Sequence, residues 1–140
     1  MSIIESIKNY LTSCPDLNGK AININYLSPE RDSFSIDNVP KNPVVKRYSD
    51  GGSLMQFCFL IAGRTVYDRD AYENMRIAEF FEDFESWIER QNSLKILPDL
   101  SDLGLLPTAI EVTKSGTVYD TARTSARFQI EARLLYRKKN

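Results

Sequence analysis

Hydrophobic residues recur at helical spacing near the start of the chain. Apolar side chains at three- and four-residue steps make one stripe, formed by Ile3, Ile4, Ile7, Tyr10 and Leu11. Ser2 and Glu5 have the spacing of a capping box, in which two side chains cap backbone amides of the first turn. We therefore predict a helix that starts after Ser2 and that Pro15 and Gly19 bring to an end.

A second, longer helical pattern covers residues 67–91. Its bulky apolar positions again recur at three- and four-residue steps, at Ile77, Phe80, Phe81, Phe84, Trp87 and Ile88. Carboxylates occupy most of the opposite side, at Glu79, Glu82, Asp83, Glu85 and Glu89. Asp70 is the expected N-cap. The pattern predicts an amphipathic helix that packs its aromatic side on a sheet.

Alternation with a period of two predicts strands in residues 20–28 and 33–39. The apolar residues that share a face are Ile22, Ile24 and Tyr26 in the first segment and Phe34 and Ile36 in the second. The second segment is short, and prolines in residues 40–43 follow it, so we predict that it is an edge strand.

Residues 44–63 have the pattern of a β-hairpin. Asp50 and Gly51 form its turn, because glycine accepts the positive φ that a tight turn requires. In the second arm, Leu54, Gln56, Cys58 and Leu60 share one face, and Met55, Phe57, Phe59 and Ile61 share the other. Both faces are apolar apart from Gln56, so we expect a central strand that is covered on both sides.

The last strand pattern is the longest. The inward positions are Ala126, Phe128, Ile130, Ala132, Leu134 and Tyr136, and the outward ones are Arg127, Gln129, Glu131, Arg133, Leu135 and Arg137. Before it, residues 108–116 predict a strand that runs into a turn at Ser115 and Gly116, and residues 118–125 predict a loop or a short strand. Together these elements predict an α+β fold, a mostly antiparallel β-sheet with two main helices on one face.

Residues 92–109 form a loop that is unusually rich in leucine. Such a segment has to bury its side chains against the rest of the domain or against a partner. The length, 140 residues, suits a single domain that covers residues 1–140.

The chain contains no histidine, which removes the commonest general base and the Ser–His and Cys–His nucleophile pairs. Cys14 and Cys58 are expected to be reduced thiols, and two cysteines without histidine argue against a zinc site. Glu5 and Lys8 interrupt the first apolar run, which is therefore not a signal peptide, and no run is long enough for a membrane helix. We expect a soluble protein that uses no metal or cofactor.

An enzyme would need carboxylates such as Glu82 and Asp83 to converge with Lys46 in a concave site. A solvated helix face is the simpler interpretation of the carboxylates. Lys46 and Arg47 precede two glycines, but the spacing is not that of a phosphate-binding loop, so we interpret them as a charged hairpin arm.

Charge is divided between two regions. Residues 68–89 hold eight carboxylates against two arginines, a net charge of −6, whereas residues 123–139 have a net charge of +5. Such a division suits head-to-tail self-association. The candidate subunit-interface residues are Lys46, Arg47, Glu82, Glu85, Glu89, Arg127, Arg133 and Arg137. Two alternatives stay open: nucleic-acid binding by the basic strand, which lacks aromatic residues on its outward face, and exposed charges without a specific role.

Three segments together, residues 42–64, 80–100 and 126–139, resemble small proteins from the head–tail gene cluster of tailed siphophages and prophages of Gram-positive bacteria. Such proteins are labelled minor capsid proteins and are similar to tail terminators. The likeness spans roughly residues 20–138 and consists of strand and helix patterns.

The resemblance implies an α+β subunit of a hexameric ring that caps the finished tail tube, stops its polymerisation and forms the head–tail joining interface. Its implied partners are further copies of the chain, the major tail tube protein and the head–tail connector protein, with DNA only passing through the ring channel. It implies a location in the virion, assembled in the cytoplasm of the host bacterium, with no enzyme activity, cofactor or membrane. A head-completion or tail-completion protein of the neck, or a small nucleic-acid-binding module, is the alternative.

Overall fold

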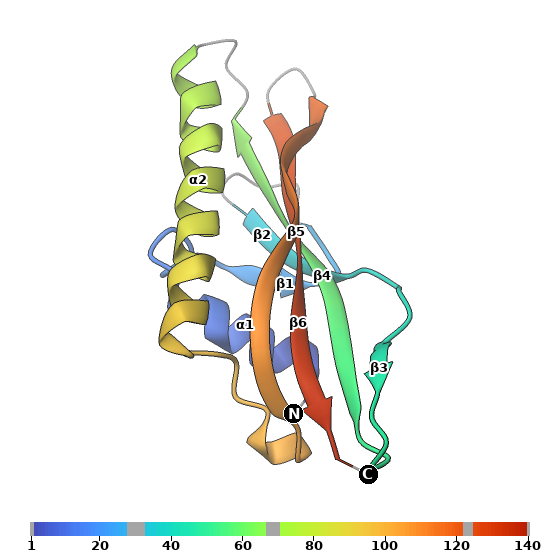
Figure 1. Cartoon of the computed structure of the whole chain (residues 1–140). Coiled ribbons are helices and arrows are strands. Elements are labelled where there is room, and N and C mark those ends of the chain that lie inside the picture. The colour runs from blue at the N-terminus through green and yellow to red at the C-terminus, as the bar shows by residue number, and fades with distance from the viewer. Residues whose placement is uncertain (1, 28–32, 67–70, 122–124, 140) are drawn as a thin grey trace.

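The computed structural model describes residues 2–27, 33–66, 71–121 and 125–139 (Figure 1). These residues form two α-helices and a mostly antiparallel six-stranded sheet, which confirms the predicted α+β class. The elements are α1 (Ile3–Leu11), β1 (Ile22–Ile24), β2 (Ser33–Asn38), β3 (Val44–Arg47), β4 (Ser53–Val66), α2 (Ala71–Leu94), the 3-10 helix η1 (Ser101–Leu103), β5 (Leu106–Thr121) and β6 (Ser125–Lys138). The predicted N-cap Asp70 lies outside the described residues.

Strand β4 is the centre of the sheet, as predicted. The strand order is β1-β2-β4-β6-β5, and β3 also pairs with β4. Strand β6 pairs with one edge of β4 from Ser53 to Val66. Strands β2 and β3 therefore both pair with the other edge of β4. The prediction that residues 33–39 form an edge strand is wrong, because the short strand β1 adds to β2 in parallel and takes the edge position.

The core lies on one face of this sheet. Ile36, Ile61 and Ile130 stand opposite one another across β2, β4 and β6, and all three are buried. α1 contacts β1 and β2, whereas α2 lies along β5. The rings of Tyr10 and Trp87 meet with their centroids 5.2 Å apart, so α1 and α2 cover the same face and also contact each other.

Ser2 caps the start of α1 as predicted, but the Glu5 side chain bonds the Ser2 hydroxyl rather than the Ser2 amide of a full capping box. The amide of Glu5 donates to Oγ of Ser2 at 3.3 Å, and the Ser2 hydroxyl donates to the Glu5 carboxylate at 3.0 Å. The helix ends at Leu11, earlier than Pro15. Turns follow through residues 12–19, and they place Cys14 and Leu17 in the core.

Strand β1 is shorter than its pattern predicted. Asn25 has a φ of 57°, which breaks the extended backbone directly after Ile24. Tyr26 consequently leaves the inner face and is 61% exposed, so its predicted position beside Ile22 and Ile24 is wrong.

The predicted turn at Ser115 and Gly116 is also wrong, since β5 continues from Leu106 to Thr121. The pairing register with β6 shifts between Lys114 and Thr117, so one extra residue of β5 is accommodated as a bulge. A Cβ placed on Gly116 would lie 2.1 Å from the ring of Phe81. The glycine is needed for close approach of α2 to the sheet rather than for a turn.

The face of β4 opposite the helices is not covered by a second layer, contrary to the prediction. α1 and α2 both contribute to the core cluster on the other face, and none of the described helices packs on this outer face. Cys58 and Leu135 are nevertheless buried there, and Leu60 is half-buried. Cys58 and Leu60 lie in pairing rows with Arg133 and Glu131 of β6, and Leu135 lies opposite Gln56 of β4. Long polar side chains of this kind can cover apolar surface with their aliphatic stems.

Helix α2 follows its predicted pattern. Ile77, Phe84, Trp87 and Ile88 are buried, and the half-buried Phe80 and Phe81 pack against the same core. The helical pattern gave no role to Asn92, whose side-chain oxygen accepts from the Ile110 amide at 2.8 Å and whose amide group donates to the Ile110 carbonyl. This pair of hydrogen bonds fastens the end of α2 to the edge strand β5.

Candidate functional site

The acidic side of α2 and Lys46 do not form a common site. Glu82 and Asp83 are exposed on α2, whereas Lys46 lies on β3, on the other side of the sheet (Figure 1). The Lys46 ammonium lies 5.6 Å from the centre of the Tyr48 ring. In the described part of the chain, no group of three or more cysteine, aspartate or glutamate side chains is placed to hold a metal ion.

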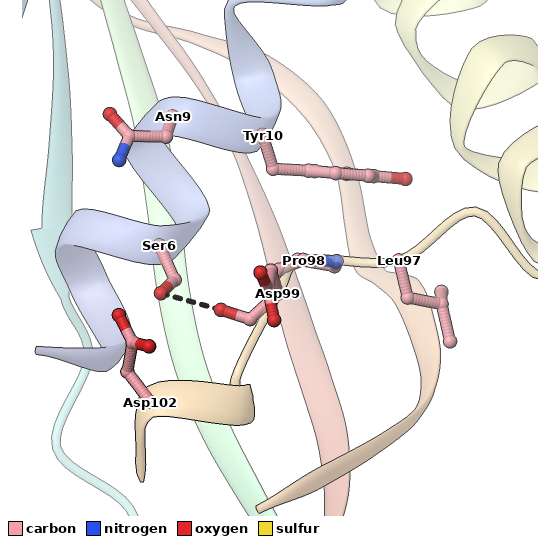
Figure 2. A pocket seen from close by; sticks show the side chains of 7 residues that line it. All are labelled: Ser6, Asn9, Tyr10, Leu97, Pro98, Asp99 and Asp102. Atoms are coloured by element: carbon pink, nitrogen blue, oxygen red, sulfur yellow. Dashed lines mark hydrogen bonds between the residues drawn. The ribbon is translucent and has the colours of Figure 1, made fainter. Parts of the chain in front are cut away.

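A hollow of about 370 Å³ separates α1 from the chain after α2 (Figure 2). Its lining residues are Ser6, Asn9 and Tyr10 of α1 and Leu97, Pro98, Asp99 and Asp102 of the later segment. The Ser6 hydroxyl donates to the Asp99 carbonyl at 2.9 Å, and the Tyr10 hydroxyl donates to the Ile96 carbonyl at 2.8 Å. These two bonds hold the leucine-rich segment against α1.

The ionisable groups of this region have structural partners. Oδ1 of Asp99 accepts from the Ser101 amide at 2.9 Å, and hydrogen bonds from Ser101 hold the pKa of Asp99 below its ordinary value. Burial raises the pKa of Tyr10 to about 12 and also raises the pKa of the Cys14 thiol. Both groups therefore stay protonated at neutral pH, and the Cys14 thiol is a poor nucleophile.

Both cysteines are free and buried, as expected for reduced thiols.

The leucine-rich segment has both buried and exposed side chains. Leu100 and Pro98 are fully buried, and Leu97 and Leu105 pack against the core. The exposed members are Leu94, Ile96, Leu103 and Leu106.

The outer face of the sheet carries a layer of paired charges. The Arg133 guanidinium donates to Gln56 at 3.1 Å and lies 3.5 Å from the Glu111 carboxylate. The Glu131 carboxylate lies 3.8 Å from the ammonium of Lys41 and 3.9 Å from that of Lys114. Arg127 forms an ion pair with Asp37 at 3.6 Å. Arg127 and Arg133, two of the predicted interface residues, therefore have carboxylate partners within the same chain.

Five other cations gather at the end of the sheet where β3 and β6 end and β4 begins. We call this group the basic end. They are Lys46, Arg47, Arg137, Lys138 and Lys139, and all five are exposed. Strand register brings them together, because Lys46 and Arg137 both pair with Leu54, and Arg47 and Lys138 both pair with Ser53. Figure 1 shows that the C-terminal end of β6 lies beside the turn between β3 and β4.

Tyr48 belongs to the basic end as well, and sequence analysis missed it. The Arg137 guanidinium lies 4.9 Å from the centre of its ring. The outward residues of the basic strand include no aromatic side chain, so the strand was expected to lack an aromatic neighbour. The hairpin register could have predicted the contact, since it places the residue after Arg47 next to the end of β6.

Exposed apolar residues lie at two opposite margins of the sheet. At the α2–β5 margin they are Leu94, Ile96, Leu103, Leu106 and Val118. At the β1–β3 margin they are Tyr26 and Val45. The strand order separates the two margins by the width of the sheet, because β5 ends it on one side and β1 and β3 end it on the other.

The two margins also differ in charge. A hollow of about 360 Å³ between α2 and β5 is lined by Glu85 and Glu89, and Glu82 lies one turn earlier on α2. The β1–β3 margin instead presents Lys46 and Arg47. Of the predicted interface residues, the structure thus places the three glutamates at one margin and these two cations at the other.

Comparison of the chain with protein-family models and with curated proteins finds no match. As for the membrane, neither described helix is both long enough and apolar enough to span a bilayer.

Proposed function

We propose that the protein is a virion structural protein, a tail terminator that caps the phage tail tube as a ring, stops its polymerisation and forms the head–tail joining interface. The sequence resemblance of residues 20–138 supports this role. The observation that carries the proposal is the pair of margins, which are both partly apolar and opposite in charge.

The margins favour contacts between unlike surfaces. Two copies joined through the same margin would place glutamate against glutamate or cation against cation, and like charges at short range repel. Contact between the α2–β5 margin of one copy and the β1–β3 margin of the next pairs opposite charges and buries apolar side chains on both sides. Contacts of this head-to-tail kind close into a ring when the rotation between copies permits.

The proposal changes the contact that charge alone had predicted. The basic C-terminal strand was expected to lie near the acidic helix of a neighbouring copy. Arg127 and Arg133 already pair with Asp37 and Glu111, so they offer less charge to a neighbour. Lys46 and Arg47 take their place as cations that face the glutamates of α2.

Charge reversal tests the contact. Glu82→Lys/Glu89→Lys makes both margins of a subunit basic, and Lys46→Glu/Arg47→Glu makes both acidic. Each variant alone should fail to assemble, whereas a 1:1 mixture should form an even-membered ring in which the two variants alternate. Analytical ultracentrifugation, with and without purified tail tubes, measures the assembled state.

An uncharged variant tests the apolar part. Leu94→Ser/Ile96→Ser removes two exposed side chains and should weaken assembly without affecting folding, as measured by circular dichroism. Assembly of the two charge-reversal variants separately, or a wild-type protein that stays monomeric even with tail tubes, would contradict the proposal.

The partners can be distinguished by direct binding. A terminator should bind the end of tubes made of the major tail tube protein and, once in place, the head–tail connector protein. Binding to the connector with no binding to tail tubes would instead indicate the alternative role of a head-completion protein.

A further inference from the structure

We propose that the basic end is a binding site for the sugar–phosphate chain of single-stranded nucleic acid, in which Tyr48 provides a stacking surface for a base. This inference goes beyond the proposed function, because a single subunit carries the whole site. In the proposed ring Lys46 and Arg47 face α2 of a neighbour, so all five cations of the site are available in the free subunit.

The cations of the basic end surround the ends of the strands on both faces of the sheet. Lys46 and Arg137 flank Leu54 and both approach the ring of Tyr48, which places them on the outer face. Arg47 and Lys138 flank Ser53, which faces the other way. With Lys139 they line a hollow of about 360 Å³ whose remaining wall is formed by Val44, Gly51, Ser53 and Met55.

No carboxylate of the described residues forms an ion pair with these five side chains. Asp50 in the adjacent turn keeps its negative charge while its Oδ1 accepts from the Gly52 amide at 2.9 Å, so the five cations still exceed the nearby carboxylate in charge. The middle of the outer face is different, because Arg127, Arg133 and Lys114 each have a carboxylate within 4 Å.

A cluster with this excess of positive charge favours an anionic polymer over a single small anion. Cations held close together repel one another, and a polyanion that supplies several negative charges relieves that repulsion. Because cations lie on both faces and at the end of the sheet, a flexible chain of phosphates can reach all five, whereas a rigid surface reaches only those on one face. Binding of such a chain releases counterions and is therefore strongly salt-dependent.

Tyr48 offers a contact to the bases of the ligand, whereas the cations contact its phosphates. Its ring is half-buried and lies next to the Arg137 guanidinium and the Lys46 ammonium. Aromatic rings beside cations are the usual platform for stacked bases in sites that bind single strands without sequence preference. A duplex keeps its bases stacked inside, so the ring favours single strands.

Fluorescence anisotropy with labelled oligothymidine of about 20 nucleotides, and with a duplex of the same length, tests the site. If all five cations bind phosphate, the affinity for the single strand should fall about 100-fold between 50 and 200 mM salt. Arg137→Ser/Lys138→Ser should weaken binding and reduce the logarithmic salt slope by about 1.4. The matched control Lys20→Ser/Arg90→Ser removes the same charge from exposed positions elsewhere and should bind like the wild type.

The aromatic contact has its own pair of variants. Tyr48→Ser should lower the affinity for oligothymidine about 10-fold and leave the duplex unaffected, whereas Tyr48→Phe keeps the ring and should retain full affinity. Equal binding by the wild type and Tyr48→Ser would overturn the stacking role.

The proposal is overturned if the folded wild type does not change the anisotropy at low salt, or if Arg137→Ser/Lys138→Ser binds as the control does. It is also overturned if that variant loses only self-association, because the basic end would then bind the acidic margin of a second copy. Failure of the proposed ring is a separate result. The uncharged variant Leu94→Ser/Ile96→Ser, when monomeric, should still bind oligothymidine.

Discussion

The two faces of β4 and β6 bury their side chains in different ways. On the inner face, Phe59, Ile130 and Leu134 are fully buried beneath α1 and α2. On the outer face, Cys58 and Leu135 are almost as well buried although none of the described helices covers them. Cys58 has Arg133 beside it in its pairing row and Glu111 beyond that, and Leu135 lies between Gln56 and Ala109.

The difference shows that burial on the outer face depends on long polar side chains. An arginine or glutamate can lay its aliphatic stem over an apolar neighbour and keep its charged group near solvent. Such cover contributes less than a packed helix does, because the polar side chains lose conformational entropy and the ion pairs are partly screened by water. The outer face should therefore tolerate substitution far better than the inner face.

The largest effect is expected for Phe59→Ala on the inner face of β4. Phe59 is fully buried, so its truncation should lower the free energy of unfolding by about 3–5 kcal/mol. The next residue, Leu60, points to the outer face and is half-buried, and Leu60→Ala should cost less than half as much. Urea unfolding of the two variants measures the comparison, and equal losses would contradict it.

Gly116→Ala tests how closely α2 packs on the inner face. The added Cβ would lie 2.1–2.3 Å from three atoms of the Phe81 ring, so the ring has to move, and we expect a loss of about 1–3 kcal/mol. In a Phe81→Ala background the ring is absent and Gly116→Ala should be nearly neutral. A double-mutant cycle measured by urea unfolding gives this coupling directly. Additive effects would show that the contact with Phe81 is not the cause.

Alkaline pH should lower the free energy of unfolding through ionisation of Tyr10, which packs in the core on the inner face. Its pKa is raised from 10.0 to about 12 chiefly by burial, so the unfolded state loses the proton first. The contribution of neutral Tyr10 to stability is therefore complete below about pH 10 and is lost as the pH rises toward about 12.

Unfolding of Tyr10→Phe across that pH range should show a shallower decline than the wild type. Some decline should remain, because burial also raises the pKa values of Tyr136 and Cys14. Identical slopes for the two proteins would rule out Tyr10 as a source of the pH dependence.

The smallest effect is expected on the outer face for Glu131→Gln. Its side chain is 12% exposed, but the side chains of the two lysines at 3.8 and 3.9 Å are 44% and 77% exposed. We expect a loss of about 1 kcal/mol or less that disappears at high salt. Glu111→Gln, which breaks the pair with Arg133, is the matched substitution and should behave alike. A loss as large as that of Phe59→Ala would contradict the comparison between the faces.

Most of the fold could be predicted because periodicity follows directly from burial on one face. The alternation of β6 and the aromatic stripe of α2 appear in the structure as predicted. The errors arose where one residue changed the backbone or where a distant contact decided the role. Asn25 ended β1 through its positive φ, and Gly116 was explained by Phe81, which is far away in the sequence.

The candidate surfaces were less predictable, because charges along one segment do not reveal their partners. The basic pattern of β6 gave no sign that Asp37 and Glu111 would pair with Arg127 and Arg133. Those partners come from neighbouring strands, and their identity depends on sheet register. For the same reason the contact of Tyr48 with Arg137 was not anticipated, although the hairpin itself was predicted.

The shifted pairing of β5 has a consequence for how the protein behaves in concentrated solution. A long edge strand is normally a template on which another chain can extend the sheet, and such growth leads to fibrils. Here the register between β5 and β6 changes at four places, and Pro107 removes one amide near the start of the strand. An incoming strand would meet an irregular row of amides and carbonyls, so fibril growth from this edge is disfavoured. Copies that meet at this margin would then join through side chains rather than by extending the sheet.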